Sequence, residues 1–181
     1  AGLDASYQNM YDAYREIFDK MELDYLIVDA DSGAMGGSGS QEFMVKSEIG
    51  EDTIPYCESC GYCANEEKAV ALPEITENDA PMGDVNKVHT PNAGTIEDVT
   101  NFLGKTAKDF AKTIIYKADD KFVAVMVRGD REVNDVKVVN AIGGAIEFDL
   151  APLDDLMEIT NAKAGFAGPV GLKIDVFVDH E

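Results

Sequence analysis

Hydrophobic and polar positions follow one another along this chain with two different periods, and the first of them is helical. Apolar side chains between residues 6 and 22 recur every three or four positions, while charged side chains occupy the opposite face. This spacing predicts an amphipathic helix whose beginning can be capped by Asp4 or Ser6. The apolar positions are Tyr7, Met10, Tyr11, Tyr14, Ile17, Phe18 and Met21.

Shorter apolar runs follow this helix. Residues 25–28 form a run bounded by acidic residues, which is typical of a buried strand. Residues 31–40 are too rich in glycine for a regular element, and residues 43–46 and 53–57 predict two weaker strands. Pro55 suits an edge position in the second of these. A helix followed by short strands indicates part of an antiparallel sheet with a helix packed against it.

The periodic pattern is interrupted between residues 70 and 87, where prolines and acidic residues occur without any period. Such a segment is typical of a linker. We therefore divide the chain into a first block, residues 1–70, a linker, residues 71–87, and a second block, residues 88–181.

The second block alternates between helical and extended patterns. Residues 111–118 and 122–127 predict a β-hairpin that turns at Asp119-Asp120. Thr95 can cap a short helix that Gly104 ends. The other expected elements are helices over 133–142 and 152–159, strands over 145–148 and 173–178, and a glycine-proline loop over 164–171. The predicted fold class is α+β, with a small mixed α/β domain after the partial antiparallel sheet.

Composition narrows the class of protein. The chain has 181 residues, of which 45% are hydrophobic, so it can bury a core and is not a disordered acidic tail. No apolar stretch approaches the roughly 18 residues of a membrane-spanning helix, so we expect no membrane partner. The chain begins at Ala1 without a signal peptide or an initiator methionine, and we expect a processed or internal segment.

The charge is strongly negative, with 35 acidic against 15 basic side chains and a formal net charge of −20. A surface that grips nucleic acid by bulk electrostatics needs a basic patch, so this charge argues against that class. Residues 1–85 contain 19 acidic and 4 basic side chains, whereas residues 86–181 contain 16 and 11. The second half is therefore the better candidate for contacting a phosphate.

The three cysteines, Cys57, Cys60 and Cys63, lie close together in the sequence. An odd, clustered set does not form a disulfide framework, so a reducing cytoplasm fits best. A tetrahedral metal site needs four ligands, and only the distant His89 and His180 could add a nitrogen. We expect free, partly buried thiols and no metal.

Four other stretches could carry chemistry. The glycine-rich segment 31–43 can approach a ligand or form a plain surface loop. Lys112 begins an otherwise apolar strand, where it can extend to water or meet a phosphate. Arg128-Gly129-Asp130 is typical of a turn with an ion pair. The consecutive N–H groups that precede Pro169 in the loop 165–169 can hold an oxyanion, or the loop can be an ordinary turn.

Taken in order, short segments over nearly the whole chain resemble bacterial-type prolyl-tRNA synthetase, a class II aminoacyl-tRNA synthetase. No single segment is decisive, but their ordered sum is specific. In the first block they are residues 6–18, the glycine loop 31–43, residues 50–52 and residues 62–67. In the second block they are residues 89–91, 95–97, 112–113, 127–137 and 165–170.

The resemblance implies that the first block is the part of the catalytic domain after motif 2, and that the second block is an inserted editing domain. Motifs 1, 2 and 3 and the anticodon-binding domain are absent, so we expect no prolyl-adenylate formation by this chain. The intact protein is expected to be a cytoplasmic homodimer that attaches proline to its tRNA with ATP and Mg²⁺. The editing domain is expected to need no cofactor. It would bind the acceptor end of tRNA(Pro) and hydrolyse mischarged alanine, because its small pocket excludes proline.

The resemblance also implies an editing site, carried over position by position. Lys112 is expected to meet the phosphate or ribose of the terminal adenosine. Gly165, Gly168 and Pro169 are expected to position the ester and the attacking water. The family mechanism is thought to use a ribose hydroxyl of the tRNA as the base, which agrees with the lack of a catalytic triad in the sequence.

The expected substrate-binding residues lie in both blocks. Gln41 stands where the family commonly has a histidine, and Cys63 stands where alanine is usual. Two alternatives stay open: a free-standing trans-editing aminoacyl-tRNA deacylase, and a non-enzymatic metal-binding module built on the cysteines. The expected substrate-binding residues are Gly36, Gly37, Ser38, Glu42 and Phe43 on the proline side of the synthetic site, with Arg128 and Asp130 at the editing pocket.

Overall fold

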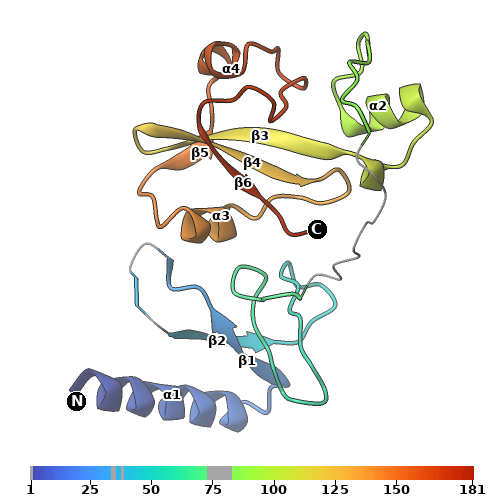
Figure 1. The fold of residues 1–181 in the computed structure, drawn as a ribbon. Coiled ribbons are helices and arrows are strands. Elements are labelled where there is room, and N and C mark those ends of the chain that lie inside the picture. Colours follow the sequence, from blue (N-terminus) through green and yellow to red (C-terminus); the bar gives the residue numbers. More distant parts are fainter. Residues whose placement is uncertain (1, 34–35, 38, 73–82) are drawn as a thin grey trace. The chain divides into compact units, whose positions relative to one another are not determined.

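The computed structural model describes residues 2–33, 36–37, 39–72 and 83–181 (Figure 1). Its helices and strands form two units, residues 1–71 and residues 72–181. The α+β class predicted from the sequence is confirmed. Within the described residues, no helix is both long enough and apolar enough to span a membrane.

The first unit begins with helix α1, Gly2–Lys20. The predicted helix over residues 6–22 is confirmed in type, but the observed helix begins and ends earlier. The expected cap at Asp4 or Ser6 is wrong, because both residues already lie inside the helix. The helix cannot continue to residue 22, because Glu22 has a left-handed φ of 54°.

Strands β1, Tyr25–Ala30, and β2, Ser40–Val45, pair antiparallel beside this helix. The predicted strands over 25–28 and 43–46 are confirmed, although their pairing extends to Ala30 and Ser40. Phe43 fixes the packing, because its ring contacts four other aromatic rings at centroid distances of 5.4 to 5.9 Å. The four partners are Tyr11, Tyr14 and Phe18 of α1 and Tyr25 of β1.

The predicted strand over residues 53–57 is wrong. Tyr56 instead makes a single antiparallel bridge with Cys63, and Ala64 makes a parallel bridge with Asp29 of β1. Pro55 has no N–H to give to a ladder, which limits the pairing that this segment can sustain. An irregular segment, rather than a third strand, therefore occupies the outer edge of β1.

The second unit is built on a sheet of four strands in the order β5, β3, β4, β6 (Figure 1). The predicted hairpin is confirmed, since β3 and β4 pair antiparallel across a turn in which Asp119 has a φ of 51°. Strand β6 pairs in parallel with the outer edge of β4. The strands are β3, Ala111–Ala118; β4, Lys121–Arg128; β5, Phe148–Leu150; and β6, Asp175–Val178.

The strand predicted over residues 145–148 begins only at Phe148. The preceding residues are bound by a side chain instead, because the N–H groups of Ile146 and Glu147 both donate to the Asp119 carboxylate at 2.9 Å. The Asp119 carboxylate at the hairpin turn therefore binds two N–H groups that would otherwise be available for strand pairing in a longer β5.

The core of the second unit lies between the sheet and helix α3, Asp135–Ala141. Asn134 caps this helix, because its side chain accepts from the Lys137 N–H at 3.1 Å. Figure 1 shows α3 on one face of the sheet and helix α4, Leu153–Thr160, on the other. The buried core residues on the α3 side are Tyr116, Val123, Val125, Val127 and Val138.

Two short helices precede the sheet. Helix α2, Ile96–Leu103, has the predicted ends, with Thr95 as its N-cap and Gly104 closing it at a φ of 64°. A 3₁₀ turn, η2, Ala107–Asp109, leads from it into β3. The helices predicted over 133–142 and 152–159 are confirmed as α3 and α4, each with slightly different ends.

Candidate functional site

The candidate site is at the end of the sheet where β3 begins and β4 ends. Lys112 lies opposite Val127 in the hairpin, so it shares the face that packs against α3. Its ammonium Nζ lies 2.8 Å from Glu132 Oε1, and its side chain is only 20% exposed, compared with 89% for Glu132. The structure therefore holds this lysine in an ion pair at the surface end of a packed strand.

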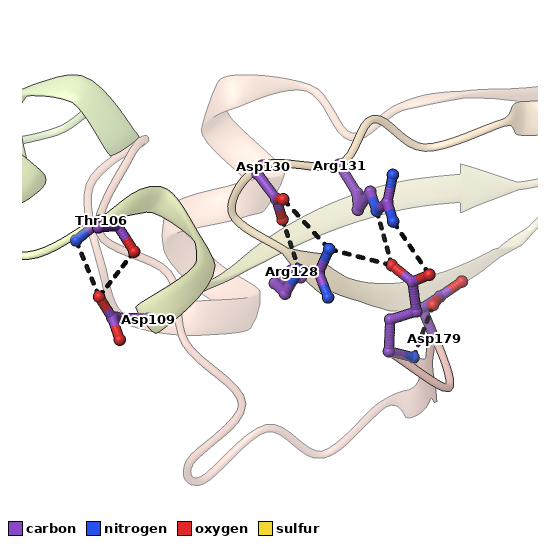
Figure 2. Close-up of polar contacts among 7 residues, drawn as sticks. Thr106, Asp109, Arg128, Asp130, Arg131 and Asp179 are labelled. Atoms are coloured by element: carbon purple, nitrogen blue, oxygen red, sulfur yellow. Dashed lines mark hydrogen bonds and ion pairs between the residues drawn. The ribbon is translucent and has the colours of Figure 1, made fainter. Parts of the chain in front are cut away.

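Arg128 and Asp130 lie at the same end of the sheet and are paired with each other. Figure 2 shows the Arg128 guanidinium against the Asp130 carboxylate, with N–O distances of 2.5 and 3.1 Å. Arg128 also contacts Glu181 at 3.2 Å, and Glu181 is held by two hydrogen bonds from Arg131. Hydrogen bonding to Arg128 lowers the pKa of the Asp130 carboxyl below its usual value.

Gly129 brings this ion-pair turn close to the preceding segment. Its N–H donates to the Phe110 carbonyl at 2.7 Å, and a Cβ at this position would collide with the Ala107 carbonyl oxygen. The same Cβ would lie 3.2 Å from the Ile96 side chain of α2. Only glycine fits here, so Arg128 and Asp130 are presented from a turn packed tightly against η2 and α2.

Gly165 makes a second close approach, between the glycine-proline loop and the segment before α2. Its φ is 85°, and a Cβ here would lie 2.5 Å from the Gly94 carbonyl oxygen. The ring of the next residue, Phe166, would contact a Cβ on Gly94 at 3.5 Å. The loop therefore lies directly on the backbone of Gly94.

A hollow of about 560 Å³ opens beside this contact. It is lined by two segments that are far apart in the sequence, residues 88–92 on one side and Ala162, Lys163 and Phe166 on the other. The lining offers the His89 imidazole, the Lys163 ammonium and the Phe166 ring, which can bind an anion, a hydroxyl group or a base. The hollow thus has the polar and aromatic groups that a terminal nucleotide requires.

The other expected residues of the glycine-proline loop, Gly168 and Pro169, are less tightly packed than Gly165. A Cβ on Gly168 would meet nothing within 4 Å, and the Pro169 carbonyl accepts from the Leu172 N–H at 3.4 Å. The start of α2 and the residues just before it link two parts of the site, because Gly94 contacts the glycine-proline loop and Ile96 packs against Gly129. Lys112 lies on the α3 face of the sheet and pairs with Glu132, so among the described contacts it is not joined to the glycine-proline loop.

In the first unit, the expected residues are not all on one surface. Phe43 is packed against α1, whereas Glu42, its neighbour on β2, points to the opposite face of the hairpin. Gly36 and Gly37 have positive φ values of 68° and 118°, as a glycine loop requires. Ser38 lies outside the described residues. Phe43 thus has a packing role that accounts for its position.

Gln41 contributes a polar group on the α1 side of this hairpin. Its amide Nε2 donates to Asp29 Oδ1 at 3.2 Å, and its Oε1 accepts from the Tyr7 hydroxyl. Together with Tyr62 and Cys63, these residues line a polar hollow of about 490 Å³. Among the described residues lining this hollow, none is a lysine or an arginine.

The three cysteines are free thiols. In the part of the chain that the structure describes, no three His, Cys, Asp or Glu side chains lie close enough to hold a metal ion. Burial raises the pKa of the Cys63 thiol, whereas hydrogen bonds from Ser59 and Cys60 lower the pKa of Cys57 to about 6. The cysteines therefore differ from one another in reactivity.

Several residues around the candidate site were not singled out from the sequence. Glu132 has no motif that marks it as the partner of Lys112, because a contact across 20 positions leaves no periodic signal. Gly94 and Lys163 likewise become apparent only when the glycine-proline loop is in place. His89 lies in a segment that carried the family resemblance, and this was the only available signal for the hollow.

Comparisons with known proteins show what this chain is similar to. The chain is 57% identical over 180 residues to a proline-tRNA ligase of Caldicellulosiruptor saccharolyticus, covering 99% of the chain and 31% of the relative. It is 52% identical over 185 positions to a proline-tRNA ligase of Thermoanaerobacter pseudethanolicus, covering 99% of the chain and 32% of the relative. The chain thus spans about a third of the length of these curated relatives.

A crystal structure of a proposed trans-editing enzyme for prolyl tRNA synthetase is also similar, with a TM-score of 0.46 and 19% identity. That similarity covers 51% of this chain and 59% of the other. The model of the aminoacyl-tRNA editing domain family matches residues 90–181, a range that includes the Lys112 ion pair, the Arg128 turn and the glycine-proline loop. Since this match extends over half of the chain, the chain belongs to the aminoacyl-tRNA editing domain family.

Proposed function

We propose that this chain is part of a proline-tRNA ligase and that its second unit hydrolyses alanine mischarged onto tRNA(Pro). The observation that carries the proposal is the 57% identity to a proline-tRNA ligase over 99% of the chain. Because the similarity includes the first unit, it favours a ligase over a free-standing deacylase. The absence of a three-residue metal cluster among the described residues gives no support to a metal-binding module.

In the proposed site, Lys112 binds a phosphate or ribose oxygen of the terminal adenosine. Substrate binding would require the Lys112 ammonium to exchange Glu132, which is 89% exposed and free to turn into solvent, for the incoming oxygen. Because the lysine is already ordered by this ion pair, little of its side-chain entropy remains to be lost on binding.

The glycine-proline loop would hold the ester. We assign the ester and the attacking water to the backbone of Gly165, Gly168 and Pro169. The base of the terminal adenosine, whose phosphate or ribose Lys112 would bind, is assigned to the hollow beside His89 and Lys163. Arg128 and Asp130 would shape the rim of the pocket. Arg128 is already ion-paired with both Asp130 and Glu181, so these charges are not free to bind the substrate. Pocket size would exclude the larger proline while admitting alanine.

The whole ligase would use ATP and Mg²⁺ to activate proline, with Gly36, Gly37, Ser38, Glu42 and Phe43 on the proline side. The polar hollow of the first unit has no cationic side chain in its described lining to bind a nucleoside triphosphate. This hollow is lined by Asp29 and neutral side chains, and Lys46 is paired with Asp24 at 2.9 Å. We therefore place ATP and Mg²⁺ with residues of the ligase outside this unit. A homodimer in the cytoplasm is the expected setting.

The decisive experiment is hydrolysis of Ala-tRNA(Pro) and Pro-tRNA(Pro) by the purified chain at high enzyme concentration. We expect alanine to be released much faster than proline. Lys112→Ala should slow the release of alanine about tenfold to a hundredfold, because one charge-assisted contact contributes about 1.5–3 kcal/mol. Equal hydrolysis of both substrates, or none by a folded chain, would contradict the proposal.

Two further variants sharpen this test. Lys117→Ala is the matched control, because Lys117 lies on the same strand but is exposed on the opposite face. It should leave the rate unchanged. Glu132→Gln keeps the size of the lysine's partner but removes its charge, so it should preserve or raise the rate. If Glu132→Gln slows the release of alanine as much as Lys112→Ala does, the reaction depends on the intact ion pair rather than on the lysine alone.

A further inference from the structure

The cysteine segment of the first unit forms a tight, hydrogen-bonded turn. The Gly61 N–H donates to the Cys57 carbonyl at 2.9 Å, and the Cys57 N–H donates to the Tyr62 carbonyl at 2.8 Å. A turn closed between positions four apart winds like one turn of helix, which places residues three apart next to each other. Cys57 and Cys60 are three apart and both lie within this turn.

Cys63 has the same spacing from Cys60 but a different setting. It lies past the turn, where its residue forms a bridge with Tyr56 and its carbonyl accepts from the Asp29 N–H at 3.0 Å. This extended pairing holds Cys63 beside strand β1. The pairs Cys57–Cys60 and Cys60–Cys63 thus have the same spacing in the sequence, but only the first lies within one turn of the backbone.

The sulfur atoms also differ in their surroundings. Cys57 Sγ lies 3.0 Å from the Ser59 hydroxyl, and Cys60 is exposed to solvent. Hydrogen bonds from Ser59 and Cys60 stabilise the Cys57 thiolate and lower its pKa, whereas burial and the Asp29 carboxylate raise the pKa of Cys63. Cys57 therefore has the character of an attacking thiol, and Cys60 that of an accessible resolving thiol.

We propose that Cys57 and Cys60 form a redox-active dithiol that exchanges with small disulfides, with Cys63 as a bystander. The Cys57 thiolate attacks one sulfur of the disulfide, forming a mixed disulfide and releasing one small thiolate. The Cys60 thiolate then attacks the Cys57 sulfur and releases the second. Two protein thiols are oxidised, one small disulfide is reduced to two thiols, and the two protons pass to those products.

Oxidation would act on the polar hollow of this unit. Gly61, Tyr62 and Cys63, which directly follow the dithiol, line that hollow together with Asp29 and Gln41. A bond between Cys57 and Cys60 would fix the turn that supports Tyr62, whose hydroxyl accepts from the Val70 N–H at 3.3 Å. The dithiol is thus a modification site at the wall of the first unit's hollow, independent of the editing function.

The test is oxidation of the folded chain with bis(2-hydroxyethyl) disulfide, followed by alkylation and peptide mapping. This neutral disulfide avoids repulsion by a chain with a net charge of −20. We expect a protein two hydrogens lighter, with Cys57 joined to Cys60 and Cys63 still alkylated. Cys63→Ser should behave identically, and Cys60→Ser should stop at a mixed disulfide on Cys57.

The unfolded chain provides the matched control, because Cys57–Cys60 and Cys60–Cys63 have the same spacing in the sequence. In concentrated urea the two disulfides should form in comparable amounts, whereas the folded chain should give almost only the first. Equal pairing in the folded chain, mixed disulfides alone, or about one zinc per chain with all three thiols protected would each overturn the proposal.

Discussion

At the scale of single residues, the position of the glycine-proline loop depends on Gly165 having no side chain. Gly165 has a left-handed φ of 85° and touches the backbone of Gly94. Gly165→Ala should therefore cost about 1–3 kcal/mol from strain and overpacking, and should displace the loop. The free energy of unfolding of the second unit, followed by urea titration, measures this effect.

Gly168→Ala is the natural comparison for stability, because a Cβ at Gly168 meets nothing within 4 Å and its φ is not left-handed. This variant should fold with nearly unchanged stability. If both alanine variants destabilise equally, the close approach of Gly165 to Gly94 is not what fixes the loop.

The sequence predicts individual residues of the site better than it predicts their partners. Lys112 could be singled out because a charged residue interrupts an apolar strand, and Arg128 and Asp130 because a turn was expected. Glu132 could not be found, since it becomes a partner only after β3 and α3 pack on each other. The aromatic packing of Phe43 against α1 is likewise visible only in the fold, and its expected place on the proline side stays a prediction.

At the scale of elements, the ends of α2 are set by local chemistry. Thr95 Oγ1 accepts from the Asp98 N–H at 3.1 Å, and the Asp98 carboxylate accepts from the Thr95 N–H at 3.2 Å. Thr95→Ala should lower the local stability of α2 by about 0.5–2 kcal/mol. Hydrogen exchange of the α2 amides, compared with those of β3, measures this loss.

Thr100→Ala is the control within the same helix. The Thr100 hydroxyl bonds back to the Glu97 carbonyl at 2.8 Å, so it caps nothing, and alanine is the better helix former. Hydrogen exchange of the α2 amides in Thr100→Ala should be as slow as in the wild type, or slower. Faster exchange in both variants would show that α2 depends on threonine packing rather than on its cap.

Elements with strong local signals were predicted closely, and those that depend on distant pairing were not. The predicted strand 111–118 has the observed bounds of β3, because alternation and the Asp119 turn agree. Residues 53–57 failed as a strand, and Ile146 and Glu147 lie outside β5 because the distant Asp119 carboxylate binds their N–H groups. A short apolar run becomes a strand only if a neighbouring edge offers a partner, and that edge is not visible in the local sequence.

At the scale of the whole molecule, the acidic excess makes paired carboxylates important for stability at low pH. Arg128 lowers the pKa of Asp130, and hydrogen bonds from Thr106 lower the pKa of Asp109 (Figure 2). Their stabilisation is complete above the unfolded-state value of about 3.9 and is lost as the pH falls through the lower folded-state values. We expect the second unit to lose stability progressively below about pH 4.

The comparison that tests this uses Asp130→Asn and urea titrations at several pH values, followed by NMR signals of the second unit's sheet. Asn cannot be protonated, so the variant should be less stable at neutral pH and should lose less on acidification. Asp120→Asn, at an exposed position in the β3–β4 turn, should keep the wild-type pH profile. If Asp130→Asn loses as much stability at low pH as the wild type, other carboxylates are responsible for that loss.

The parallel pairing of β6 with β4 has a consequence for how the second unit is made. A ribosome releases the hairpin of β3 and β4 long before residues 175–178, yet β4 needs those residues to cover its outer edge. Until then the nascent chain carries an unpaired, apolar strand edge, which is a template for association with other chains. A translational pause would therefore be most costly after β4 has left the ribosome and before residues 175–178 have done so, because the edge stays open during that interval.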